Sequence, residues 1–205
     1  MKLNDKLATI KRYNERLSQF GYDLKTLGWG GDQARQELRF EKILEINNFI
    51  HNKKIVSVLE VGCGFGDMGH FLAEYAPNVC YTGVDINPEL IQIGKEKFPS
   101  LDLRVMDIQE ETIETYDLVC SVGIFNHQLS MQDEMEYIEE MLAQFFKLAK
   151  LGVAVDFMST FVDFQHSGAF HMPEGQALRI AKKMTKRIIL RNDYLDYEYC
   201  MYLLK

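Results

Sequence analysis

Residues 58–69 hold the most informative stretch of the chain, Val58-Leu59-Glu60-Val61-Gly62-Cys63-Gly64-Phe65-Gly66-Asp67-Met68-Gly69. An apolar run rich in β-branched residues starts at Lys54 and leads into this stretch. Such a run is typical of a parallel strand that is covered on both faces. The glycines that follow let the backbone turn tightly and approach a ligand closely. The stretch therefore predicts a strand, a turn that faces a ligand, and a helix.

Strand and helix patterns alternate along the chain after this stretch. Further strands are expected at residues 79–84, 103–106, 118–122 and 153–157, with helical spacing of apolar residues between several of them. This alternation predicts an α/β fold with a doubly wound, mostly parallel, Rossmann-like sheet. Two last strands, at 187–190 and 197–202, have only a short turn between them, so they should pair antiparallel and complete a seven-stranded sheet.

The N-terminal residues 1–53 have a helical pattern. Apolar residues recur at spacings of three and four up to Phe20, and a second helix is expected from about 32 to 50. A glycine-rich tract around Trp29 separates the two. Because 205 residues suit one domain, we expect a single domain with a helical cap or lid (1–53) on a cofactor-binding core (54–205).

Charge and cysteine content limit the function classes. The chain has 23 Lys and Arg against 30 Asp and Glu, a net charge of −7. Nucleic acid and anionic membranes are therefore not expected as partners, because such sites need a basic field. The four cysteines form no C-x-x-C pair, and no metal site is expected. Without an apolar signal or membrane segment, the expected location is the reducing cytoplasm.

The glycine cluster fits two motifs. Gly64-Phe65-Gly66-Asp67-Met68-Gly69 fits the dinucleotide fingerprint G-x-G-x-x-G, whereas Glu60 with Gly62, Gly64 and Gly66 fits acid-x-G-x-G-x-G. Asp85 ends the next strand and could accept hydrogen bonds from ribose hydroxyls in either case. The carboxylate of Glu60 would repel a pyrophosphate but could attract an ammonium or sulfonium group. A nicotinamide-dependent oxidoreductase remains the alternative, although little chain is left for its substrate domain.

The second motif resembles motif I of class I S-adenosylmethionine-dependent methyltransferases. The resemblance covers about residues 54–205 and includes Asp85, an acid at Asp107 after the third strand, and the antiparallel end of the sheet. Residues 28–40 and 190–194 resemble the corresponding segments of a bacterial-type subgroup of small, uncharacterised methyltransferases. The resemblance implies methyl transfer from S-adenosyl-L-methionine to a small-molecule acceptor, by O- or N-methylation, which leaves S-adenosyl-L-homocysteine. A binding protein of the same fold without turnover is a further alternative.

The expected cofactor-binding residues lie at the ends of the first four strands and in the cap. They are Glu60, Gly62, Gly64, Gly66, Asp67, Asp85, Ile86, Asp107, Ile108, Ser121, Gly123 and Trp29. Asp67 could instead cap the following helix, and Trp29 could be a packing anchor. Arg39 could bind the carboxylate of S-adenosylmethionine or an anionic acceptor, or it could be a solvated helix charge.

The acceptor site is expected just after the fourth strand, since ligands of open α/β sheets bind at the carboxyl ends of strands. Asn126 and His127 stand there, and both are candidate catalytic residues. His127 is the natural base for an oxygen acceptor of high pKa. The N/D-P-P-Y/F/W motif is absent after this strand, which makes DNA adenine methylation an unfavourable interpretation. The sequence leaves the oligomeric state open.

Overall fold

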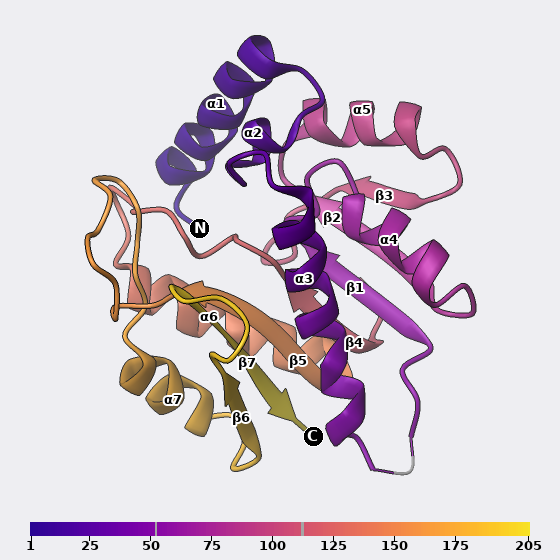
Figure 1. The fold of residues 1–205 in the computed structure, drawn as a ribbon, viewed down its shortest axis with the longest axis vertical. Helices are drawn as coiled ribbons and strands as arrows, with labels where there is room; N and C mark the ends of the chain where they lie inside the picture. The colour runs from indigo at the N-terminus through magenta and orange to yellow at the C-terminus, as the bar shows by residue number, and fades with distance from the viewer. Residues whose placement is uncertain (52, 112) are drawn as a thin grey trace.

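The computed structural model describes residues 1–51, 53–111 and 113–205, and it places one mixed sheet at the centre (Figure 1). Within these residues the strand order is β3-β2-β1-β4-β5-β7-β6. The strands are β1 (Ser57–Val61), β2 (Cys80–Asp85), β3 (Asp102–Val105), β4 (Tyr116–Ser121), β5 (Ala149–Met158), β6 (Ile188–Arg191) and β7 (Glu198–Leu204). β7 runs antiparallel to both β5 and β6, and the other pairs are parallel. The predicted fold class is confirmed.

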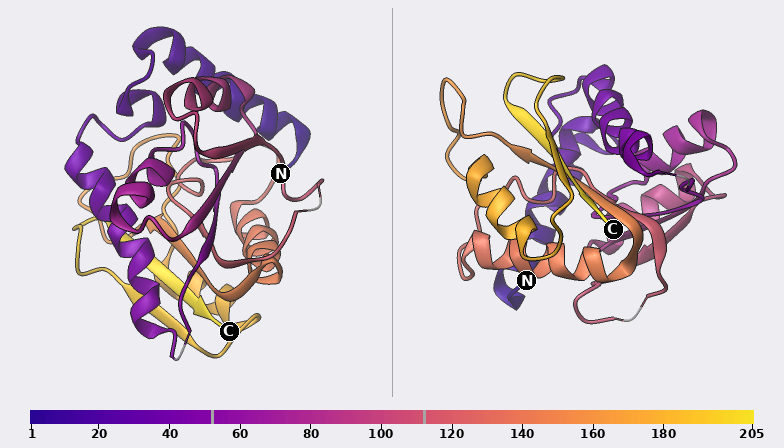
Figure 2. Two further views of the ribbon diagram at one scale, coloured as in Figure 1. Left: turned by 90° about the vertical axis from the view of Figure 1, so that its right-hand side faces the viewer. Right: turned by 90° about the horizontal axis from the view of Figure 1, so that it is seen from below.

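Helices cover both faces of the sheet (Figure 2). α3 (Gln33–Leu44), the short 3-10 helix η1 (Glu45–Phe49), α4 (Asp67–Tyr75) and α5 (Pro88–Lys97) lie on one face. α6 (Glu134–Leu148) and α7 (Glu174–Lys182) lie on the other. The start of α5 follows from its sequence, since the Asn87 side chain accepts from Glu89 N at 2.9 Å and Pro88 fills the first turn.

The expected N-terminal cap is divided in the structure. Phe40, Ile43 and Ile46 are buried against Val58 and Leu118, so α3 is part of the layer that covers the sheet. α1 (Leu3–Phe20) and the four-residue α2 (Leu24–Leu27) instead lie above the sheet, beside the carboxyl ends of the central strands (Figure 1). Of residues 1–53, α3 and η1 therefore cover a face of the sheet, and α1 and α2 lie at the ends of its strands; a lid role stays a prediction.

Among the helices described by the structure, none is long and apolar enough to cross a membrane.

Candidate functional site

A cavity opens where the carboxyl ends of β1, β2 and β4 meet the N-terminal helices. From the sheet, its wall includes Glu60, the loop 61–64, Asp85–Asn87, Met106–Gln109 and Val122–Ile124. From the cap, its wall includes Thr9, Ile10, Tyr13, Leu27 and Trp29. The ends of parallel strands are the usual ligand site of such sheets. Most of the predicted residues therefore meet at one place.

The turn after β1 requires glycine. Gly62, Gly64 and Gly66 have φ values of 76°, 57° and 88°, in the left-handed region. A Cβ at Gly62 would also overlap the side chain of Ile124. Gly62 and Gly64 line the cavity, whereas Gly66 packs against Leu103 and faces away from it. Because glycine has no side chain, the backbone of this loop is exposed at the cavity surface.

Two carboxylates flank this turn. Glu60 is buried and accepts a hydrogen bond from the Tyr81 hydroxyl. Burial raises the pKa of Glu60 to about 8, and the charges of Asp67, Asp85 and Asp156 add to the rise. Asp85 accepts from Gly64 N at 2.9 Å and from Asn87 N at 2.8 Å, and burial raises its pKa. With a pKa of about 8, Glu60 is mostly protonated near pH 7, and a neighbouring positive charge would favour its ionised form.

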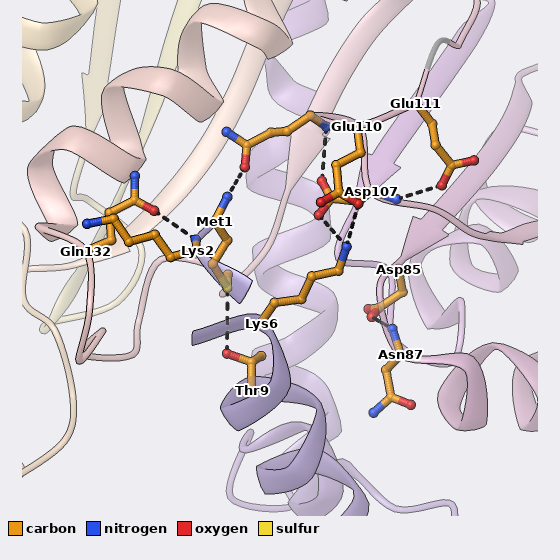
Figure 3. A network of polar contacts seen from close by, with 11 residues as sticks. Met1, Lys2, Lys6, Thr9, Asp85, Asn87, Asp107, Glu110, Glu111 and Gln132 are labelled. Carbon is orange, nitrogen blue, oxygen red and sulfur yellow. Dashed lines mark hydrogen bonds and ion pairs between the residues drawn. The ribbon is translucent and has the colours of Figure 1, made fainter. Parts of the chain in front are cut away.

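Asp107 is another carboxylate of the cavity wall, and it forms an ion pair with Lys6 of α1. Its Oδ2 pairs with Lys6 Nζ at 2.8 Å, and its Oδ1 accepts from Gln109 N at 3.0 Å. Figure 3 shows the Lys6 side chain reaching from α1 between Asp107 and Glu110. These contacts hold the first turns of α1 over the cavity.

Asp67 and Trp29 link the cap to the core. Asp67 does not cap α4, since it is the first residue of that helix and its N-cap is Gly66. Its carboxylate instead accepts from the Tyr22 hydroxyl at 2.7 Å and lines the cavity. Trp29 also lines the cavity, and its ring lies against Gly123, where a Cβ would overlap it. Trp29 is thus both a packing anchor and a part of the cavity wall.

Arg39 is not a solvated helix charge, because its side chain is only 8% exposed. Its Nε donates to Glu198 at 2.6 Å, and its guanidinium lies 4.6 Å from the centre of the Trp29 ring. The buried Asp156 lies nearby and accepts from Gly123 N at 2.6 Å. Burial raises the pKa of Asp156 to about 7, and the charge of Glu198 adds to the rise. Sequence reasoning missed Asp156 because it stands inside an apolar strand.

His127 and Tyr13 also line the cavity, and His127 Nε2 lies 3.2 Å from the Tyr13 hydroxyl of α1. Burial lowers the pKa of His127 to about 4, and the charges of Arg12 and Arg16 add to the shift. Burial raises the pKa of Tyr13 to about 12. Both groups are therefore neutral near pH 7, and one donates to the other. The sequence indicated His127 but gave no sign of Tyr13, which is 114 residues away.

Two other predicted residues lie outside the cavity wall. Ser121 is fully buried, and its Oγ has no hydrogen-bond partner within the described residues. Asn126 accepts from Phe170 N through its backbone oxygen, and its Oδ1 is buried without a partner among those same residues. Neither is in direct contact with the cavity.

The carboxylates and glycine backbone of the cavity wall suit a nucleoside that carries a positive charge. Asp85 and Asp107 can accept from hydroxyl and amino groups, because each oxygen of a carboxylate has a second lone pair. Glu60 can face a cation, and the bare backbone of Gly62 and Gly64 permits close approach. A pyrophosphate would meet carboxylates and no arginine or lysine on the loop 61–67.

Comparisons with known proteins agree with this geometry. A family model described as a methyltransferase domain matches residues 59–153. The putative methyltransferase 235L of Invertebrate iridescent virus 6 is 29% identical over 117 residues, which cover 55% of this chain and 44% of that protein. Malonyl-[acyl-carrier protein] O-methyltransferase 1 of Ilyobacter polytropus is 33% identical over 100 residues, which cover 42% of this chain and 37% of that protein. The chain spans less than half the length of these curated relatives.

Solved structures are similar over the whole chain. Magnesium protoporphyrin IX methyltransferase from Synechocystis PCC 6803, with bound S-adenosylmethionine, matches with a TM-score of 0.68 at 16% sequence identity. The match covers 100% of this chain and 98% of that protein's chain. The plantazolicin methyltransferase BpumL, in complex with a desmethyl analog and S-adenosylhomocysteine, has a TM-score of 0.65 at 13% identity, with coverages of 100% and 99%. At these identities the likeness establishes the fold.

Proposed function

We propose that the chain is a class I S-adenosylmethionine-dependent methyltransferase, whose cavity binds S-adenosylmethionine and directs the methyl group to a small-molecule acceptor; the methyltransferase-domain model over residues 59–153 supports this proposal. One observation carries this proposal: four carboxylates, those of Glu60, Asp67, Asp85 and Asp107, line the same cavity as the Tyr13–His127 pair. When bound, S-adenosylmethionine supplies a methyl group on a positively charged sulfur. The family and the acidic loop favour this function over nicotinamide-dependent oxidation.

In the proposed complex, Asp85 accepts from the ribose hydroxyls and Asp107 from the adenine amino group. Glu60 faces the positively charged end of the cofactor, where a nearby cation would favour its ionised form. Gly62 and Gly64 give the cofactor access to the backbone. Asp67, Ile86, Ile108, Gly123 and Trp29 also line the cavity and are proposed to contact the cofactor.

The acceptor is proposed to lie against Tyr13 and His127. Holding the acceptor atom in line with the methyl group and excluding water are the main tasks of the protein. A neutral imidazole with a pKa of about 4 accepts hydrogen bonds at pH 7 but holds a transferred proton weakly. This property favours an ionised oxygen or an amine nitrogen over a hydroxyl of high pKa. A role of Asn126 in acceptor binding stays a prediction.

The test is calorimetric titration of the protein with S-adenosylhomocysteine and, separately, with NADH. We expect S-adenosylhomocysteine to bind and NADH not to bind. Asp85→Asn should weaken binding by roughly 10- to 150-fold, the value of a lost hydrogen bond to a charged group, about 1.5–3 kcal/mol. Asp196→Asn is the control, because it alters an exposed carboxylate outside the cavity.

Tight binding of NADH without binding of S-adenosylhomocysteine would contradict the proposal. Equal affinities of the wild type and Asp85→Asn would contradict the assignment of the ribose to Asp85. Cofactor binding without transfer to any oxygen or nitrogen acceptor in a panel would instead support a binding protein without turnover.

A further inference from the structure

Asp156 is a buried carboxylic acid behind the wall of the cavity. It lies near the carboxyl end of β5, and only 2% of its surface is exposed. Its Oδ1 accepts from Gly123 N at 2.6 Å, whereas its Oδ2 is buried without a hydrogen-bond partner among the described residues. A buried polar atom without a partner destabilises a protein, and an apolar side chain at position 156 would avoid that cost. Stability alone therefore does not account for a carboxyl group at this position.

Gly123, the donor to Asp156, belongs to the cavity wall. It follows β4 in the loop 122–124, which lines the cavity, and its φ of 81° lies in the left-handed region. Its N–H is directed to Asp156, which lies outside the cavity wall. The hydrogen bond therefore fixes the orientation of the peptide group between Val122 and Gly123.

The backbone of Gly123 is also the surface on which Trp29 packs. A Cβ on Gly123 would lie 2.5 Å from Trp29 Cη2, so the ring rests directly on the glycine. The guanidinium carbon of Arg39 lies 4.6 Å from the centre of the same ring. Trp29 lines the cavity as well. A shift of Gly123 would therefore displace two parts of the cavity wall, the loop 122–124 and the Trp29 ring.

We propose, on the basis of the function proposed above, that Asp156 is a positioning residue for the cofactor site. Through Gly123 it holds the loop 122–124 and the Trp29 ring in the positions that bind S-adenosylmethionine. This role needs a hydrogen-bond acceptor and no charge. Burial raises the pKa of Asp156 to about 7, and the protonated carboxyl still accepts from Gly123 N through its carbonyl oxygen. An asparagine side chain supplies the same acceptor.

The test compares Asp156→Ala, which removes the acceptor, with Asp156→Asn, which keeps it. The affinity for S-adenosylhomocysteine is measured by calorimetric titration, and the fluorescence of Trp29 reports on its ring, because the chain has one tryptophan. We expect Asp156→Ala to weaken binding about 5- to 10-fold, the value of a lost hydrogen bond. Its Trp29 emission should shift to longer wavelength, since the ring becomes more exposed to water. Asp156→Asn should keep the wild-type emission and bind within about twofold of the wild type.

Asp117→Ala is the matched control. Asp117 also accepts from backbone N–H groups, that of Val56 at 2.9 Å and that of Ser57 at 3.1 Å. It lies near the amino end of β4 and outside the cavity wall. A loss of stability alone would appear in the thermal unfolding of both alanine variants, but Asp117→Ala should change neither the Trp29 emission nor the affinity for S-adenosylhomocysteine.

Wild-type emission and affinity in Asp156→Ala would overturn the inference, as would an Asp156→Asn variant that binds as weakly as Asp156→Ala. Equal losses of affinity in Asp117→Ala would overturn it as well. Gly123→Ala displaces Trp29 from the other side of the hydrogen bond, so wild-type emission and affinity in that variant would contradict the inference even if Asp156→Ala does not fold. Failure of the wild type to bind S-adenosylhomocysteine would refute the proposed function, whereas intact binding in Asp156→Ala would refute this inference alone.

Discussion

Replacing Arg39 with methionine removes the cation of a buried ion pair between α3 and β7. The Arg39 side chain is 8% exposed and that of its partner Glu198 is 17% exposed. Methionine keeps much of the apolar stem, so the change mainly removes the charge and the hydrogen bonds. Asp156 would also lose a neighbouring positive charge, because Arg39 acts on that carboxyl as well.

The expected cost follows from the burial of the pair. Removing one partner of a buried ion pair destabilises a protein by about 3–5 kcal/mol, because the other charge is left without compensation. Glu198 is partly exposed, so we expect the lower end, about 3 kcal/mol. In a chain of this length, each kcal/mol lowers Tm by roughly 2–4 °C, which gives a decrease of about 6–12 °C.

Thermal unfolding followed by circular dichroism measures this change. The matched control is Arg35→Met on the same helix, where the side chain is 65% exposed and pairs with Asp32 at 3.4 Å. This control should change the free energy of unfolding by less than about 1 kcal/mol. The double variant Arg39→Met/Glu198→Leu should recover much of the loss, since no unpaired charge remains. A Tm decrease below about 2 °C for Arg39→Met, or a double variant as unstable as the sum of the single ones, would refute the reasoning.

Three further predictions concern the site. Lys6→Met should remove the ion pairs with Asp107 and Glu110 and speed hydrogen exchange of the first turns of α1 about 5- to 150-fold; unchanged exchange would show that these ion pairs do not hold α1 in place. The buried Glu60 binds a proton more tightly in the folded than in the unfolded state, so stability should fall between pH 4.5 and 8, by at most about 1.4 kcal/mol per pH unit. Glu60→Gln should flatten this slope in urea unfolding, and an equal slope would contradict the pKa. Gly62→Ala should cost about 2–4 kcal/mol through strain and overlap, whereas Gly175→Ala, which meets open space, should be neutral or stabilising; equal melting temperatures would disprove this account.

The sheet could be predicted from the sequence because its signals are local. The apolar runs, the glycines after β1 and the Asn87-Pro88 helix start each depend on neighbouring residues alone. α2 was missed because four residues, Leu24–Leu27, are too few for a periodic pattern. The division of the cap was also missed, since the helical spacing of α3 does not reveal which surface it covers.

The parts of the site that depend on distant residues could not be predicted. Arg39 is buried because Glu198, 159 residues later, neutralises it. Tyr13 contacts His127 because α1 lies against the segment that follows β4, where Asp5 also accepts from Ser130 N. The low pKa of His127 also has a tertiary cause, since burial and the charges of Arg12 and Arg16 produce it. A single sequence shows where a strand ends, but not which helix will cover that end.

A crystal structure of the complex with S-adenosylhomocysteine tests the central claim most directly. We expect the ribose hydroxyls within hydrogen-bond distance of Asp85 and the adenine amino group beside Asp107. The sulfur should lie in the cavity between the loop 62–64 and the Tyr13–His127 pair, where a methyl group would face the acceptor end. Density for the ligand outside this cavity, or a sulfur turned away from His127, would contradict the account.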